Sequence, residues 1–190
     1  AGHEVEGSPE GDAEGRDALS VRPFLNEAGT ARFLPFSLMR EVDVPRPAVT
    51  VATIVERDGA FLLVEEMTRS GLRLNQPAGH LEAAETLAAA AARETLEETR
   101  YRVAPSAVVG IYRWQAADSG ATFVRFAFAA AVVGHEPERA LDEGIVRALW
   151  LTYDELVAMR PLHRSPLVLR CVDDWRAGRR LPLATVTEVG

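Results

Sequence analysis

The sequence predicts an α/β domain in which a mixed β-sheet is covered by helices on both faces. Short β-branched or apolar runs alternate with segments of helical spacing, which is the pattern of layered α/β folds. At least one pair of runs is joined by a tight turn and should be antiparallel. Of the 190 residues, 47% are apolar, which is enough for a core of this kind.

The first 43 residues differ from the rest. They open with an acidic stretch, rich in Gly and Glu and without an apolar period, which predicts a flexible N-terminal extension. Residues 21–42 carry more apolar side chains. They are expected either to wrap around the domain or a partner subunit, or to form a disordered tail with exposed apolar residues. A homodimer is therefore possible. The domain itself is expected to span residues 44–190.

Six apolar runs are predicted as strands. They are Val49–Glu56, Ala60–Met67, Leu72–Gln76, Ala107–Gln115, Ala121–Val133 and Ile145–Leu151. The turn sequence Arg57-Asp58-Gly59 joins the first two into a hairpin. Asp118-Ser119-Gly120 is ordinary turn chemistry and predicts a second hairpin between the fourth and fifth runs.

Three helices are predicted around these strands. An alanine-rich helix runs from about Ala84 to Thr99. Thr152 and Glu155 have the spacing of a capping box that opens a short helix. Leu167–Arg176 has helical apolar spacing and is followed by Gly178, a helix stop signal.

The helix over residues 84–99 carries the most distinctive chemistry. At about 100° per residue, Glu94, Glu97 and Glu98 fall on one arc roughly 100° wide. Small residues, including Thr95, fall on another arc that can pack closely on a sheet. Three neighbouring carboxylates repel one another unless a cation lies among them, and oxygen ligands suit Mg²⁺ or Mn²⁺. A solvated acidic face is the alternative interpretation.

The spacing is more specific than an acidic cluster alone. The positions that matter are Gly79, Glu85, Arg93, Glu94, Glu97 and Glu98. Their order and intervals resemble the signature of the Nudix hydrolases, which cleave diphosphates linked to another moiety. This resemblance implies an α/β/α sandwich with a mixed sheet. Two positions depart from the signature, because Thr95 replaces a bulky aliphatic residue and Arg100 replaces a glycine that caps the helix.

The resemblance also implies roles for the signature residues. Glu94, Glu97 and Glu98 match the metal-binding positions of the family. Glu97 or Glu98 is also expected to take the proton from the attacking water, and the sequence does not separate the two. Arg93 is expected to orient the neighbouring carboxylates through hydrogen bonds. Glu85 is expected to form a salt bridge or to mark the helix start.

A further carboxylate from elsewhere in the chain often joins such sites within the family. Asp142 and Glu143, which lie just before the last predicted strand, are the candidates. A solvated loop is an equally good interpretation of either residue.

Segments that flank the signature narrow the resemblance to the NudJ-type phosphatases. These segments are Val64–Glu66, Leu74–Glu82, Arg113-Trp114, Phe123–Phe126, Arg164–Val168 and Gly178–Leu183. That branch comprises small phosphatases acting on nucleoside di- and triphosphates and on the thiamine-precursor pyrimidine pyrophosphate. It implies that orthophosphate is released.

Four flanking residues are predicted to contact the substrate, and each has a structural alternative. Gln76 holds a substrate amide or hydroxyl, or pairs with nearby backbone. Trp114 stacks on a ring, or is a partly buried core residue. Arg125 contacts a phosphate or base, or pairs with an acid. Arg164 clamps a phosphate, or forms a surface ion pair.

The composition limits the partners. A net charge of −7 argues against a long nucleic acid and leaves a small phosphorylated substrate as the expected partner. There is no apolar run of about 18 residues, so no membrane span is expected. The single cysteine, Cys171, excludes an internal disulfide and is expected in the core. We expect a soluble, cytoplasmic protein.

These observations favour Mg²⁺-dependent hydrolysis of phosphoanhydride bonds in small di- and triphosphates. Within the enzyme class, the alternative is an ADP-ribose or nucleotide-sugar pyrophosphatase. In a different class, the alternative is a ligand sensor that has kept the fold without catalysis. A complete set of signature carboxylates argues against the sensor.

Overall fold

The computed structural model describes residues 24–25, 31–32 and 46–189. The chain divides into two compact units, Ala1–Val44 and Pro45–Gly190. In the first unit, strand β1 (Phe24–Leu25) pairs antiparallel with β2 (Ala31–Arg32). The rest of the predicted flexible extension, and any part that it plays in a dimer, lies outside the described residues and stays a prediction.

The second unit is built on seven strands and three α-helices. The strands are β3 (Ala48–Arg57), β4 (Ala60–Thr68), β5 (Gly71–Asn75), β6 (Ala78–His80), β7 (Tyr101–Gln115), β8 (Thr122–His135) and β9 (Ile145–Thr152). The helices are α1 (Leu87–Thr99), α2 (Tyr153–Ala158) and α3 (Leu167–Arg176), with short 3₁₀ turns at Arg160–Leu162 and Leu183–Thr185.

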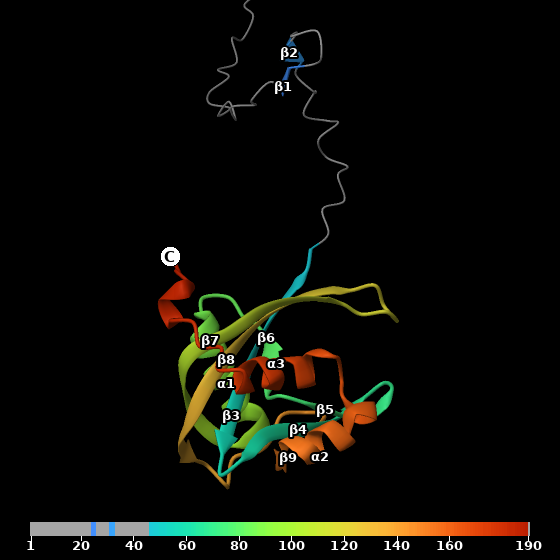
Figure 1. The fold of residues 1–190 in the computed structure, drawn as a ribbon, viewed down its shortest axis with the longest axis vertical. Coiled ribbons are helices and arrows are strands. Elements are labelled where there is room, and N and C mark those ends of the chain that lie inside the picture. The colour runs from blue at the N-terminus through green and yellow to red at the C-terminus, as the bar shows by residue number, and fades with distance from the viewer. Residues whose placement is uncertain (1–23, 26–30, 33–45, 190) are drawn as a thin grey trace, which may run out of the picture. The chain divides into compact units, whose positions relative to one another are not determined.

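Strand β3 links the two parts of the sheet. Its residues 48–55 pair in parallel with β8, and residues 50–52 pair antiparallel with β6 on the other side. Its last residues form the predicted hairpin with β4, which also pairs with β5 and β9. β7 and β8 form the second predicted hairpin. One parallel pair among antiparallel ones makes the sheet mixed, as predicted (Figure 1).

Helices cover both faces of this sheet because successive side chains of a strand point to opposite sides. On β3, Val51 packs with Ala90 and Ala91 of α1, whereas Ile54 packs with Val168 of α3. All of these side chains are at most 1% exposed. α3 lies in front of the strands in Figure 1. The predicted α/β/α sandwich is therefore confirmed.

Helix α1 begins three residues later than predicted. Ala84 adopts a φ of 64°, outside the helical region, and Thr86 is the N-cap, accepting a bond from the backbone N–H of Ala89 at 3.1 Å. The helix ends at Thr99, as predicted. Arg100 replaces the expected glycine by adopting the left-handed conformation itself, with a φ of 65°. The Arg100 Nε donates to the carbonyl of Arg139, which ties the end of α1 to the loop between β8 and β9.

Two strands differ from the prediction. β6 was not among the predicted strands, and its three residues are held by pairing with β3. β7 begins at Tyr101 instead of Ala107. The strand therefore runs through Pro105, where the pairing shifts register, and β7 is the last strand in the sheet order. An edge strand tolerates proline because one side needs no hydrogen-bond donor.

The C-terminal elements follow the prediction. The capping box forms between Thr152 and Glu155 and opens α2. α3 has the predicted bounds, and its residue Cys171 is fully buried in the core, as predicted. Among the helices that the structure describes, none is long and apolar enough to cross a membrane.

A buried pair of threonines fixes α1 on β3, and its removal tests this packing. Thr95 donates to the carbonyl of Ala91 at 2.7 Å and lies 2.7 Å from the hydroxyl of Thr53, which must donate to it. Thr95→Val leaves the Thr53 hydroxyl buried without a partner. We expect a loss of about 1–3 kcal/mol in the free energy of unfolding, measured by urea denaturation.

The double variant Thr53→Val/Thr95→Val removes both hydroxyls and is the control. It should be more stable than Thr95→Val, because no buried donor is left unpaired. Equal stability of the single and double variants would show that Thr53 finds another partner.

Candidate active site

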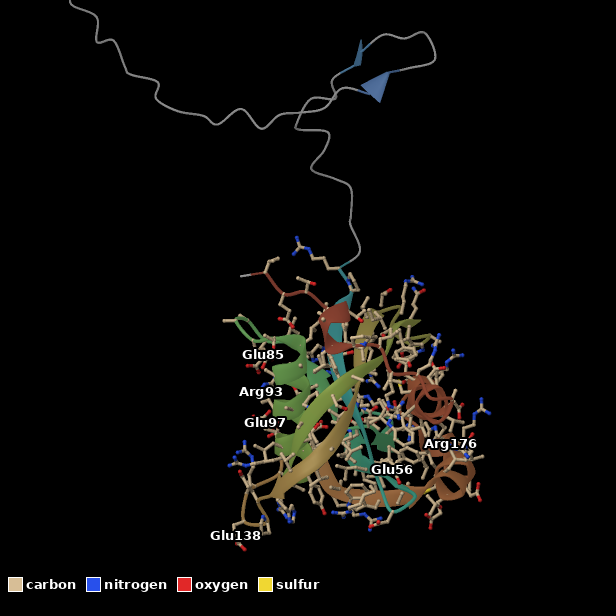
Figure 2. All side chains as sticks on the ribbon, turned by 60° about the vertical axis from the view of Figure 1, so that its left-hand side comes forward. Glu56, Glu85, Arg93, Glu97, Glu138 and Arg176 are labelled. Atoms are coloured by element: carbon tan, nitrogen blue, oxygen red, sulfur yellow. The ribbon has the colours of Figure 1, made fainter. Side chains whose placement is uncertain are left out.

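Arg93 is the centre of a charge network on α1. Its Nε and Nη2 donate to the two carboxylate oxygens of Glu85, at 3.0 and 2.7 Å. Its Nη1 donates to Glu94 Oε1 and Glu97 Oε2, at 2.9 Å each, and Nη2 also donates to the carbonyl of His80. Figure 2 shows Glu85, Arg93 and Glu97 along one side of the helix. The salt bridge predicted for Glu85 is confirmed. These bonds, chiefly those to Glu85, raise the pKa of Arg93.

Strand β6 lies against the carboxylates of Glu98 and Glu94. Glu98 Oε2 accepts a bond from the backbone N–H of Ala78 at 2.8 Å. A Cβ on Gly79 would lie 2.1–2.2 Å from the atoms of the Glu94 carboxylate, so only glycine leaves room for it. β6 was not predicted as a strand from the sequence. The fixed interval between Gly79 and the helix was the signal that could have shown its part in the site.

The carboxylates form a region of uncompensated negative charge. Burial raises the pKa of Glu98 to about 8, because the single bond from Ala78 does not offset the loss of water. The charges of Glu94, Glu66 and Asp142 raise this pKa further. Burial also raises the pKa of Glu94. A cation placed among these groups would relieve the repulsion.

The donor set suits a hard divalent cation, although it is not arranged around one. Within the described part of the chain, no three His, Cys, Asp or Glu side chains surround a single point as metal ligands. Glu94 and Glu97 each have one oxygen on Arg93. Carboxylate oxygens and excess negative charge fit Mg²⁺ or Mn²⁺ chemically.

The loop before β9 brings Asp142 to this region. Its backbone N–H donates to the carbonyl of Glu97 at 3.2 Å, and Arg139 lies 3.7 Å from the Glu97 carboxylate. Arg100 holds the same loop from the end of α1. Of the two candidate carboxylates in this loop, it is the charge of Asp142 that raises the pKa of Glu94 and Glu98.

A cavity of about 230 Å³ lies next to β6 and the carboxylates. Its lining consists of Thr50, Glu66, Asn75, Ala78, Gly79, His80, Trp114, Phe123, Arg125, Arg164 and Leu167. Arg125 is 8% exposed and donates to Asn75 Oδ1 at 3.4 Å. Arg164 pairs with Glu66 at 2.5 Å. Burial lowers the pKa of Arg125, and it raises the pKa of Glu66 despite the two nearby guanidinium groups.

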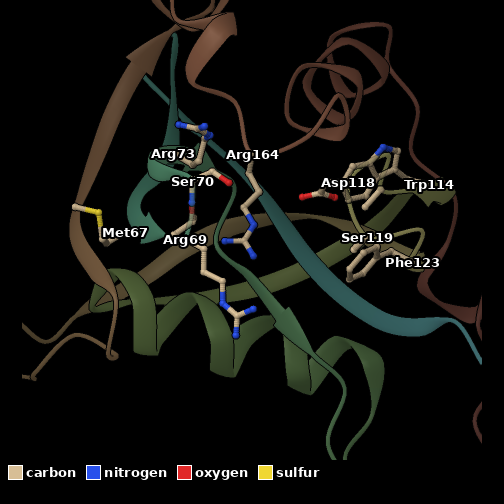
Figure 3. Close-up of a pocket in the computed structure, with 11 residues that line it drawn as sticks. Met67, Arg69, Ser70, Arg73, Trp114, Asp118, Ser119, Phe123 and Arg164 are labelled. Atoms are coloured by element: carbon tan, nitrogen blue, oxygen red, sulfur yellow. The ribbon is translucent and has the colours of Figure 1, made fainter.

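A wider hollow of about 430 Å³ shares Trp114, Phe123 and Arg164 with this cavity. Figure 3 shows Arg69, Arg73 and Arg164 on one side of it and the two aromatic residues on the other. The rings of Trp114 and Phe123 stack with centroids 5.4 Å apart. The hollow combines positive charge with a flat apolar surface, in a chain whose net charge is −7.

The structure brings together three of the four predicted substrate contacts. Trp114, Arg125 and Arg164 line the 230 Å³ cavity. Trp114 is half-buried and also packs against the core, so both interpretations of it apply. Gln76 is 1% exposed and donates to the carbonyl of Val168 at 2.6 Å. It is not among the residues that line the cavity, and its contact with a substrate stays a prediction.

Comparison with known proteins agrees with this fold. Residues 44–170 match the family model described as NUDIX domain. The chain is 40% identical over 141 residues to Phosphatase NudJ of Escherichia coli K12, covering 74% of this chain and 91% of that protein. It is 47% identical to a NUDIX hydrolase from Nitrosomonas europaea, with a TM-score of 0.74, covering 76% of this chain and 98% of that structure.

More distant structures show the fold alone. An ADP-ribose pyrophosphatase from Streptococcus suis is 16% identical, with a TM-score of 0.53 over 70% of this chain and 93% of that one. The family match and the two nearer relatives show that this chain belongs to the Nudix family and is a Nudix hydrolase. The predicted resemblance to NudJ-type phosphatases is confirmed.

Substitution of Gly79 tests the close approach of β6 to α1. In Gly79→Ala the new methyl group overlaps the Glu94 carboxylate, which must move. Because that carboxylate is the end of a flexible side chain, the fold should survive. We expect a loss of turnover on the order of 100-fold, as for other displaced site groups. Steady-state kinetics and circular dichroism check both parts. Unchanged turnover would show that the position of Glu94 is unimportant.

The raised pKa of Glu98 predicts how stability depends on pH. Its ordinary value is 4.5 and its folded value is about 8, so the folded state holds an extra proton between these limits. Stability from this group is therefore complete below about pH 4.5 and is lost as the pH rises towards about 8. We expect Glu98→Gln, which does not titrate, to remove this part of the decline. Urea denaturation of both proteins with a metal chelator over this range measures it. Parallel curves would contradict the assignment.

Proposed function

We propose that this Nudix hydrolase is a Mg²⁺-dependent phosphatase that cleaves terminal phosphoanhydride bonds of small compounds and releases orthophosphate. The observation that carries the proposal is the 40% identity to Phosphatase NudJ over 91% of that protein. The candidate substrates are nucleoside di- and triphosphates and the thiamine-precursor pyrimidine pyrophosphate. The signature carboxylates, which a sensor would not need, support catalysis.

Glu94, Glu97 and Glu98 would hold the metal. When bound, a divalent ion neutralises phosphate charge and makes a water molecule more acidic. Mg²⁺ is proposed, with Mn²⁺ as a substitute, because the available donors are carboxylate oxygens. Both Glu94 and Glu97 would exchange a bond to Arg93 for a bond to the ion.

The protein side chains divide the remaining work. Glu97 or Glu98 takes the proton from the attacking water, and Arg93 keeps the carboxylates in place through Glu85. Arg164 lies in the adjacent cavity, where a guanidinium group can stabilise the negative charge of a phosphate, and Arg125 lies in the same cavity as a further contact for the substrate. Trp114 offers a ring face to the organic part of the substrate.

Product analysis separates this function from its alternatives. The protein is incubated with Mg²⁺ and a panel of nucleoside di- and triphosphates, the pyrimidine pyrophosphate, ADP-ribose and a nucleotide sugar. Release of orthophosphate from the terminal phosphates supports the proposal. Cleavage of only the linked diphosphates would favour the pyrophosphatase. Ligand binding without turnover would favour the sensor.

Removal of the Glu97 charge tests the catalytic centre. Glu97→Gln keeps the size of the side chain and should fold normally. We expect at least about a 100-fold loss of metal-dependent turnover, as for other groups that stabilise charge in a transition state. Glu136→Gln is the matched control, because Glu136 also pairs with Arg139 and lies on the neighbouring loop. Near-normal turnover in Glu97→Gln would overturn the assignment.

A further inference from the structure

Three residues that line one cavity each have a buried polar atom without a hydrogen-bond partner. The atoms are Thr50 Oγ1, Glu66 Oε1 and Arg125 Nε, contributed by β3, β4 and β8. Thr50 is 6% and Arg125 is 8% exposed, and the Glu66 side chain is 16% exposed. A buried donor or acceptor without a partner destabilises the fold. Their convergence on one cavity therefore indicates a ligand that supplies the missing bonds.

The chemistry of these atoms limits the ligand. Glu66 Oε2 accepts a bond from Arg164, so Oε1 remains as an acceptor that needs a donor. Arg125 Nε is a donor that needs an acceptor. A phosphate satisfies Arg125 but places negative charge beside Glu66. A group with a neighbouring N–H donor and nitrogen acceptor satisfies both atoms.

The remaining walls favour a flat ring. Trp114 and Phe123 stack on each other and line the same cavity. A volume of about 230 Å³ is smaller than the pockets of roughly 300–1,000 Å³ that hold drug-sized ligands, and it suits a single ring system. The carboxylates around Arg93, which lie beyond β6, are then left for the diphosphate.

We infer that Glu66 and Arg125 determine specificity by binding the amino-bearing edge of a nitrogen heterocycle. Glu66 Oε1 accepts from the exocyclic amine, and Arg125 Nε donates to the adjacent ring nitrogen. Asn75 keeps Arg125 in position through its bond to Nη1. An oxo ring presents the opposite pattern, a carbonyl and an N–H, and is disfavoured at both atoms. The inference rests on the proposed function, because it places the ring next to the site of diphosphate cleavage.

Matched amino and oxo compounds test this directly. Turnover is compared for CDP against UDP and for ADP against IDP, and equilibrium binding for CMP against UMP and for AMP against IMP. We expect at least one pair to show a preference of about tenfold or more for the amino ring, since a site that pairs buried polar groups rejects an analogue that leaves them unpaired. Equal values in every pair would overturn the inference.

Glu66→Gln inverts the recognition group. The carbonyl oxygen of the introduced amide can keep the bond from Arg164. The amide NH₂ group then replaces Oε1, so a donor faces the ligand in place of an acceptor. In Glu66→Gln, the preference for the amino ring over the oxo ring should disappear or reverse. Glu65→Gln is the matched control. Glu65 is the neighbouring residue on β4, is 6% exposed and pairs with Arg147 away from the cavity. This variant should keep the preference.

The remaining outcomes separate the inference from the proposed function. If Glu66→Gln lowers turnover equally for all rings and raises the Mg²⁺ requirement, Glu66 belongs with the metal ligands and the inference is wrong. If no diphosphate is hydrolysed but the monophosphates are still distinguished through Glu66, the proposed phosphatase falls and the ring site stands. The monophosphates serve this purpose because they have no phosphoanhydride bond to cleave.

Discussion

The close contact between α1 and β6 is the constraint on which the site depends. Glu98 reaches the backbone N–H of Ala78, and the Glu94 carboxylate lies over Gly79, where any side chain would overlap it. This approach is possible because α1 presents buried alanines and a threonine to the sheet. Small residues allow a helix to approach closely, so that the backbone of β6 binds Glu98 and leaves room for the Glu94 carboxylate over Gly79.

Arg93 offsets the repulsion between the carboxylates that this packing brings together. Acidic side chains crowded on one helix repel one another, and burial makes this worse because less water remains to screen them. One guanidinium group bonded to Glu85, Glu94 and Glu97 holds them close together before any cation binds. Glu98 lies beyond its reach and keeps a raised pKa. The carboxylates thus differ in how strongly they are neutralised, and so in how readily each can accept a proton.

The fold and the catalytic helix could be predicted because their signals are local. Turn residues fix both hairpins, the capping box fixes α2, and the interval from Gly79 to Glu98 fixes the signature. β6 and the early start of β7 could not be predicted, since β6 owes its form to pairing with β3 and Pro105 is tolerated only at a sheet edge. The cavity was visible only in part. Arg125 and Trp114 were predicted as substrate contacts, whereas Glu66 and Thr50 became notable only once the strands placed them on the same cavity with unpaired buried atoms.

The parallel pairing of β3 with β8 has a consequence for folding. These strands are separated by α1 and the long strand β7, so their ladder joins residues as far apart in the chain as Ala48 and Phe123. Contacts of such long sequence separation form slowly. Thr50, Glu66 and Arg125 come from β3, β4 and β8, which means that the cavity does not exist in any fragment that lacks this ladder. A compound bound there would therefore stabilise the complete domain against unfolding and would slow its opening.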